Sequence, residues 1–255
     1  MRYCRIDVGG DPRWGRVGAD EIHLLRSSPI GGDPAPDGTV VPLAGAAFLP
    51  PVVPGVFYAV GYNYRGHISH AGVALPARPE VGYRANNALT GHGSPIVRPA
   101  GVTGRFEAEP EVVAVVGRTL RRASRAEAQE SVFGWTIGND VTERAWQKND
   151  PTNLRGKNAD TFKPMGPWIA TGIEPCDMTT TVHLNGETLH KFPTGDMLFS
   201  AGEVISDISR TNTLSPGDVV WLGTDELPQS IEPGDTIEIE ISGIGVLRNR
   251  VVAGQ

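Results

Sequence analysis

Cysteine is nearly absent from this chain of 255 residues, which carries Cys4 and Cys176 and no others. Two thiols can form neither a disulfide framework nor a four-thiolate zinc site, so we expect a reducing, cytoplasmic setting. A membrane helix is not expected either, because the charge-free stretch 38–64 is interrupted by four prolines, and prolines break helices. Three charged side chains within the first seven residues also argue against a secretory signal.

Basic residues are not in excess. The sequence has 23 Lys and Arg against 29 Asp and Glu, a formal net charge of −6, whereas a nucleic-acid surface needs surplus positive charge. A basic run at Arg118, Arg121, Arg122 and Arg125 is interpreted as the solvated start of a helix. We therefore expect a small-molecule partner, with no role for nucleic acid or a membrane.

Long helices are excluded by composition. With 32 glycines and 21 prolines, the chain has too many helix breakers for a helical bundle, and the predicted fold class is mainly β (α+β). Capping boxes beginning at Ser124 and Ser200 predict two helices of about ten residues. An Asn185-Gly186 turn predicts a hairpin over 180–191. Apolar runs bounded by turn residues predict further strands over 3–8, 13–17, 21–25, 112–116, 134–140, 219–223 and 236–241.

The chain is predicted to have two parts. Residues 28–54 are rich in Gly, Pro and Ala, a composition typical of a linker. We accordingly expect a small N-terminal β domain with its linker over 1–52 and a larger domain over 53–255.

The stretch Phe106-Glu107-Ala108-Glu109-Pro110-Glu111 is the most informative for chemistry. In an extended chain Glu109 and Glu111 point to the same face, because side chains alternate. Neighbouring carboxylates repel each other more strongly as they are buried, and a cation between them or protonation relieves the repulsion. The alternative is a solvated acidic strand edge.

Asp140 follows directly on an apolar run, Gly134 to Asn139. It either completes an oxygen-ligand site with the two glutamates or caps the following helix. Three carboxylates without His or Cys nearby suit Mg²⁺, with Mn²⁺ or Ca²⁺ as alternatives, and do not suit zinc.

Two further stretches contain candidate catalytic groups. His67 and His70 would share one face of a helix, and His67 could act as a general base. The alternatives are a structural histidine or a zinc pair, although no third zinc ligand lies nearby. Lys157, in the loop Arg155-Gly156-Lys157-Asn158, either stabilises an oxyanion or remains solvated.

Together and in this order, these stretches resemble the fumarylacetoacetate hydrolase family. The resemblance covers 57–251, about three-quarters of the chain. It implies a mixed β-roll with few short helices, usually a homodimer, and a Mg²⁺-dependent enzyme acting on a 2-oxo acid. Shorter matches support it, namely Gly166-Pro167-Trp168, Asn185-Gly186-Glu187, Thr194-Gly195-Asp196-Met197, Pro216-Gly217-Asp218 and Gly223-Thr224.

The resemblance also implies roles for individual residues. It assigns Glu109, Glu111 and Asp140 to the metal; Glu107 also forms a Glu-x-Glu with Glu109, but the distance to Gly117 favours the later pair. The implied catalytic and substrate-contacting side chains are His67, Lys157, Tyr64, Arg144, Gln147 and Thr224. Arg84 replaces a common family lysine, and its planar fork suits a substrate carboxylate.

This sequence departs from the family at residue 70. Hydrolases of the family usually carry a glutamate three residues after the catalytic histidine, where a carboxylate orients the imidazole and raises its basicity. His70 can orient His67 only through a hydrogen bond. The loop 223–228 is also short, so the substrate's identity does not carry over.

We expect C–C bond hydrolysis of an acylpyruvate-like or fumarylpyruvate-like 2-oxo acid, with water activated by His67. The alternative is an isomerase, tautomerase or decarboxylase that uses the same metal site and needs no hydrolytic water. A catalytically inactive binding protein is the third hypothesis.

Overall fold

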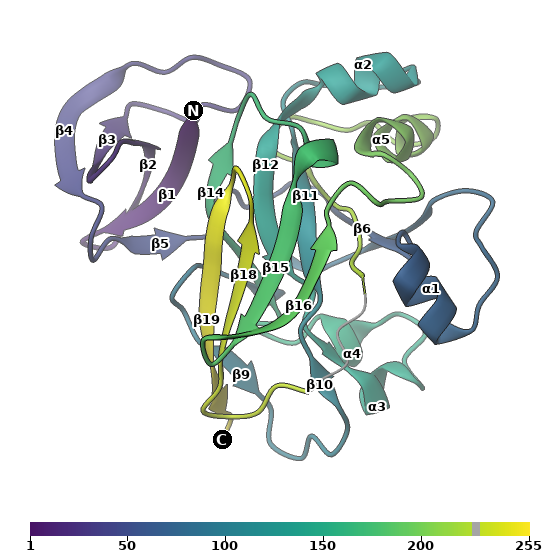
Figure 1. The fold of residues 1–255 in the computed structure, drawn as a ribbon. Helices are drawn as coiled ribbons and strands as arrows, with labels where there is room; N and C mark the ends of the chain where they lie inside the picture. Colours follow the sequence, from purple (N-terminus) through teal and green to yellow (C-terminus); the bar gives the residue numbers. More distant parts are fainter. Residues whose placement is uncertain (226–229) are drawn as a thin grey trace.

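The structure, a computed structural model, describes residues 1–225 and 230–255. The second half of the 223–228 loop therefore lies outside the described residues. The mainly β prediction is confirmed, since strands dominate and the helices are few and short (Figure 1).

A twelve-stranded sheet runs through the molecule. Along its main path the strands are, in spatial order, β4 (Pro36–Pro42), β3 (Glu21–Leu25), β2 (Asp11–Val17), β1 (Arg2–Val8), β14 (Lys163–Ala170), β12 (Val132–Asn139), β11 (Pro110–Val116), β17 (Val219–Trp221), β6 (Phe57–Gly61) and β7 (Glu80–Tyr83). Two short strands join this path, β5 (Ala47–Leu49) beside β1 and β8 (Leu89–Thr90) beside β14. Because β1 pairs antiparallel with β14, the N-terminal strands extend the sheet of the larger region.

The prediction of a linker over 28–54 is wrong for part of that stretch, 36–42 and 47–49. β4 lies within it and pairs with β3, and β5 pairs with β1. β4 is the edge strand of the sheet and has prolines at both ends. Edge strands tolerate proline, so a linker-like composition is compatible with a strand here.

A second sheet of five strands packs against the first (Figure 1). Its order is β16 (Glu187–Pro193), β15 (Thr179–Leu184), β18 (Thr236–Ile241), β19 (Gly245–Ala253) and β9 (Ile96–Arg98). A separate short pair joins β10 (Phe106–Glu107) to β13 (Thr142–Glu143). The predicted hairpin turn is confirmed, because Asn185 and Gly186 both have positive φ, 54° and 86°, as a type I′ turn requires.

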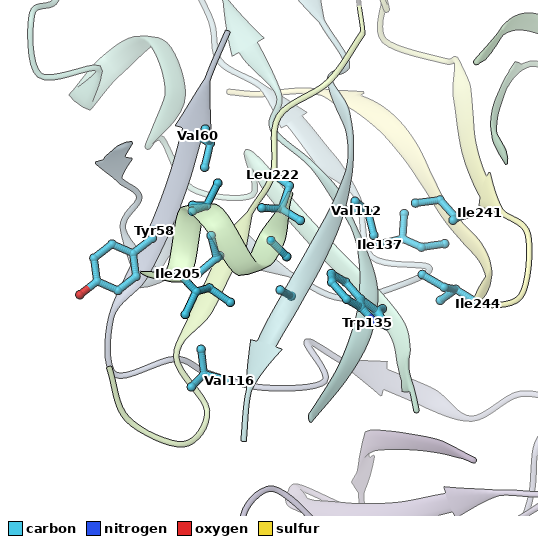
Figure 2. Packing of buried hydrophobic residues seen from close by; sticks show 14 of the residues in the cluster. Tyr58, Val60, Val112, Val116, Trp135, Ile137, Ile205, Leu222, Ile241 and Ile244 are labelled. Carbon is cyan, nitrogen blue, oxygen red and sulfur yellow. The ribbon is translucent and has the colours of Figure 1, made fainter. Parts of the chain in front are cut away.

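The main hydrophobic core lies between these layers. Figure 2 shows Val112, Trp135 and Ile137 of the large sheet near Ile241 and Ile244, which belong to the second sheet and its turn. Every residue of β11 is buried, which confirms the prediction of a strand covered on both faces. This packing fixes β11 and β12, whose adjoining ends carry the candidate carboxylates.

The helices are short. They are α1 (Arg65–Ala71), α2 (Arg125–Glu130), α3 (Arg144–Gln147), α4 (Leu154–Lys157) and α5 (Ala201–Ser209), with 3₁₀ turns η1 (Asn86–Ala88) and η2 (Pro175–Asp177). Both predicted capping boxes form, at Ser124 and at Ser200. However, α2 has six residues instead of about ten, because the chain enters β12 at Val132. No helix within the described residues is long and apolar enough to cross a membrane.

Candidate active site

A cavity of about 1050 Å³ opens beside α1. Residues of β6, β7, α3 and α4 and the adjoining ends of β11 and β12 line it. Ten of the eleven site residues predicted from the sequence are among its lining, namely His67, His70, Arg84, Glu109, Glu111, Asp140, Arg144, Gln147, Lys157 and Thr224.

Two neighbouring strands bring the three carboxylates together. Glu109 directly precedes β11, Glu111 is the second residue of that strand, and Asp140 directly follows β12. The antiparallel register sets Glu111 opposite Gly138, and the amide of Asp140 donates to the carbonyl of Glu109 at 2.8 Å. Carboxylate oxygens of the three residues lie within 4.8 Å of one another, and all three residues are buried. A solvated acidic edge is therefore excluded.

The structure excludes two alternatives considered above, Glu107 as a member of the cluster and Asp140 as a helix cap. Glu107 lies outside the cluster, where its carboxylate accepts a hydrogen bond from Arg144 Nε at 2.6 Å. Asp140 does not cap the following helix, since the Glu143 side chain accepts from the Trp146 amide at the start of α3.

Three basic side chains surround Asp140. Arg84 donates to both of its oxygens, from Nε to Oδ1 at 3.0 Å and from Nη2 to Oδ2 at 2.7 Å. Lys157 Nζ donates to Asp140 Oδ2 at 2.9 Å and to Glu109 Oε2 at 2.6 Å. Lys163 Nζ lies 2.6 Å from Asp140 Oδ1. Lys157 is thus a buried member of the cluster and not a solvated loop lysine.

The local chain path explains how Lys157 reaches the carboxylates. The Asp150 side chain accepts the amides of Arg155 at 2.6 Å and Gly156 at 3.0 Å, which closes the turn that contains α4. A Cβ at Gly156 would lie 2.8 Å from the Cα of Gln147. Glycine at this position therefore allows α4 to approach α3 closely and brings Lys157 into the cavity wall.

Burial and charge act in opposite directions on the three carboxyls. Burial would raise the pKa of Glu109, but its ion pairs with Lys157 and Arg144 lower that pKa to about 2. Burial is likewise outweighed at Asp140, whose pKa is held well below its usual range by Arg84 and the neighbouring lysines. Burial, followed by repulsion from Asp140 and Glu109, raises the pKa of Glu111 well above its ordinary value. Glu111 is therefore the one carboxyl of the three whose pKa is raised, and a bound cation would lower that pKa and favour its ionised form.

The cluster fits a hard divalent ion. Its three donor groups offer only oxygen, the donor type that Mg²⁺, Mn²⁺ and Ca²⁺ prefer. A dication among them would also offset the repulsion that raises the pKa of Glu111. The identity of the ion stays a prediction.

The two histidines lie on one side of α1. They are three residues apart, and both line the cavity. The helix ends at Gly72 with φ 66°, a left-handed cap that glycine adopts without strain. Thr224 also lines the cavity, and its hydroxyl donates to the carbonyl of Asp225 at 2.7 Å.

Arg144 of α3 contacts the carboxylate cluster, and Gln147 of the same helix contacts Arg144. Arg144 Nη2 lies 2.7 Å from Glu109 Oε1, and Nη1 donates to Gln147 Oε1 at 2.9 Å. Their implied contact with substrate stays a prediction, as does that of Arg84.

Tyr64 is the exception among the predicted site residues. It is buried, its hydroxyl donates to the carbonyl of Thr194 at 2.6 Å, and its ring packs edge-on against Phe192. Its backbone forms an isolated bridge with Met197, which directs the ring toward β16. The tyrosines that line the cavity, among the described residues, are Tyr58, Tyr62 and Tyr83.

The prediction missed Lys163. This lysine is fully buried in β14 and contacts Asp140. The available signal was a single charge inside the run Phe162-Lys163-Pro164-Met165, because a buried lysine requires a partner.

Comparisons with known proteins assign the family. The family profile described as "Fumarylacetoacetate (FAA) hydrolase C-terminal" matches residues 56–252, and the profile "Rv2993c-like, N-terminal" matches residues 1–51. The chain is 38% identical to the "4-hydroxyphenylacetate degradation bifunctional isomerase/decarboxylase" of Salmonella dublin over 78% of this chain and 47% of the relative. It is 32% identical to the "2,4-didehydro-3-deoxy-L-rhamnonate hydrolase" of Sphingomonas sp. (strain SKA58), over 98% of this chain and 96% of the relative.

A solved structure is similar over almost the whole chain. The crystal structure of 5-carboxymethyl-2-hydroxymuconate delta-isomerase from Mycobacterium smegmatis has a TM-score of 0.90 and 35% identity, and the match covers 99% of this chain and 100% of that one. The family profile spans most of the chain, and the match to the Sphingomonas relative covers nearly all of both chains. The chain therefore belongs to the fumarylacetoacetate hydrolase family.

Proposed function

We propose that this protein is a divalent-ion-dependent enzyme that moves a proton within an acidic 2-oxo acid, as a tautomerase or isomerase. The observation that carries the proposal is the presence in one cavity of a buried three-carboxylate cluster and two imidazoles one helical turn apart. Named relatives that catalyse isomerisation support the same reaction class.

Glu109, Glu111 and Asp140 would hold the ion. When bound, a divalent ion supplies Lewis-acid chemistry, which acidifies the carbon next to a keto group. The sequence-based choice of Mg²⁺, with Mn²⁺ or Ca²⁺ as alternatives, is part of this proposal.

The residues of the chain would divide the remaining work. Arg84, Arg144 and Lys157 lie in the cavity wall, where each is paired with at least one of the acidic side chains. Their guanidinium and ammonium groups would also be the donors available to a substrate carboxylate. Lys157 would stabilise negative charge that develops on an oxygen of the substrate. One imidazole would take a proton from carbon, and the second would return a proton at another atom. The composition of the substrate does not change, so no water is consumed.

Hydrolysis of a C–C bond is the second candidate. It is favoured by the similarity to the Sphingomonas hydrolase, which extends over 98% of this chain, and by the place of His67 in the cavity wall. In that reaction His67 would take a proton from water, and the water oxygen would bond to the distal carbonyl carbon. The adjacent C–C bond would then break, and the released carbon would take up a proton, which gives a free acid and a 2-oxo acid.

One experiment separates the two reactions. The Mg²⁺-loaded protein is incubated in deuterated water with oxaloacetate and, separately, with an acylpyruvate, and the products are followed by nuclear magnetic resonance. Proton transfer predicts faster enol–keto interconversion and deuterium at the carbon next to the keto group. Pyruvate together with a free acid, formed from the acylpyruvate, would instead establish hydrolysis. If neither substrate reacts and Glu109→Ala behaves like the unaltered protein, the proposal fails and a binding function is favoured.

Residue 70 gives a test of the hydrolytic alternative. His70→Glu is expected to raise any hydrolytic rate by about tenfold, because a carboxylate one turn from His67 makes its imidazole more basic. Ser69→Glu, which adds the same charge at the neighbouring exposed position of α1, is the control and is expected to change the rate little. A loss of rate in His70→Glu would mean that His70 has its own role.

A further inference from the structure

Lys163 is a lysine without any exposed surface, placed at the start of β14. Lysine is almost never fully buried unless its charge is paired. The proposed reaction gives this residue no task, although its ammonium group contacts one of the three clustered carboxylates.

The contacts of Lys163 fix its ammonium group in place. Nζ lies 2.6 Å from Asp140 Oδ1 and donates to the carbonyls of Val141 and Phe162, each at 3.0 Å. These three oxygen acceptors match the three protons of an ammonium group. The two carbonyl bonds prevent the amine from moving away when the charge beside Asp140 changes.

Asp140 does not depend on Lys163 for its position. Arg84 binds both of its oxygens, and Lys157 binds Oδ2. A planar guanidinium that bonds both oxygens sets the orientation of the carboxylate. Burial lowers the pKa of Lys163 to about 7, and its ion pair with Asp140 opposes this effect. In its protonated form, which the three oxygen acceptors favour, Lys163 adds a positive charge to the cluster on the side of the protein interior.

We propose that Lys163 is a positioning residue that acts through Asp140 to weaken the affinity of the Glu109–Glu111–Asp140 cluster for divalent cations. The inference rests on the proposed function of the cluster as a metal site. A buried positive charge beside a ligand carboxylate repels a dication in the same cluster. The bound ion would consequently exchange with solution, and activity would follow the concentration of free divalent ion.

The test uses Lys163→Met in the full chain, because methionine keeps much of the volume and removes the charge. Calorimetry with Mg²⁺ is expected to show affinity that is higher by roughly tenfold or more, since the opposing charge is gone. A purely structural role would instead predict weaker binding. Lys191→Met removes an exposed charge on β16 and is expected to leave the Mg²⁺ affinity unchanged.

Lys163→Gln provides a second neutral variant, whose amide can still donate to a backbone carbonyl. Equal or weaker Mg²⁺ binding by a folded neutral variant would overturn the role of Lys163 while leaving the proposed metal site intact. Loss of the fold in both variants would overturn it as well, because the proposal assigns the placement of Asp140 to Arg84. If the unaltered protein binds neither Mg²⁺ nor Mn²⁺, the metal site itself fails, and the role of Lys163 fails with it.

Discussion

Replacing Asp140 with alanine is expected to abolish divalent-ion binding and to lower the free energy of unfolding by about 3–5 kcal/mol. The carboxylate is the shared partner of Arg84, Lys157 and Lys163. Its removal takes away one of three clustered oxygen ligands and leaves buried positive charges without their partner. Loss of a buried charge partner is among the most destabilising single changes known.

Two measurements check this expectation. Calorimetry with Mg²⁺ and Mn²⁺ reports the affinity, and urea unfolding reports the stability. Asp177→Ala, which removes an exposed aspartate in η2, is the matched control and is expected to change neither quantity appreciably. Unchanged Mg²⁺ affinity in Asp140→Ala would remove Asp140 from the set of ligands.

His67→Ala is expected to lower kcat by about 10²–10⁴-fold, the usual contribution of a general acid–base group. The Mg²⁺ affinity is expected to remain unchanged, because His67 is not one of the clustered carboxylates. His70→Ala is expected to lower kcat as well if the two imidazoles divide proton removal and proton return. Steady-state kinetics with oxaloacetate, together with calorimetry, measures both effects.

A histidine far from the cavity supplies the control for this pair. His23 lies in β3 of the N-terminal strands, and His23→Ala is expected to leave kcat unchanged. If His67→Ala keeps full kcat, His67 is not a proton-transfer group. If His70→Ala keeps it as well, proton transfer by α1 is wrong, and the base must come from another group in the cavity.

The carboxylate cluster was predictable because its geometry is local to two strands. The alternation of side chains sets Glu109 and Glu111 on one face, and an antiparallel neighbour that ends at Asn139 brings Asp140 beside them. Both the side-chain period of a strand and the position of an acid at the end of an apolar run can be read directly from a sequence.

Features that depend on contacts between distant segments were not predictable. Tyr64 turns away from the cavity because of partners 130 residues away along the chain. The partner of Lys163 is Asp140, which directly follows a different strand, β12. Composition alone also made the 28–54 stretch resemble a linker, although strand pairing with β1 and β3 orders part of it.

The fold does not test every prediction made from the sequence. The division of the chain at residue 52 and the homodimer stay predictions, as do the Mg²⁺ ion and the reaction. Family membership is compatible with isomerases, decarboxylases and hydrolases among the named relatives. The chemistry depends on how a substrate lies relative to α1, which apolar periodicity and residue spacing do not determine.

The way in which basic side chains hold the acids has a consequence for how the protein takes up a metal. Glu109 and Asp140 are bonded on both oxygens, and the backbone amide of Gly223 donates to Glu111 at 2.7 Å. The ion pairs of Glu109 and Asp140 thus offset the cost of burying these two carboxylates before any ion is encountered, whereas burial and repulsion still raise the pKa of Glu111. The cavity is preorganised, and ion uptake is expected to be an exchange of one cation for another with little backbone rearrangement.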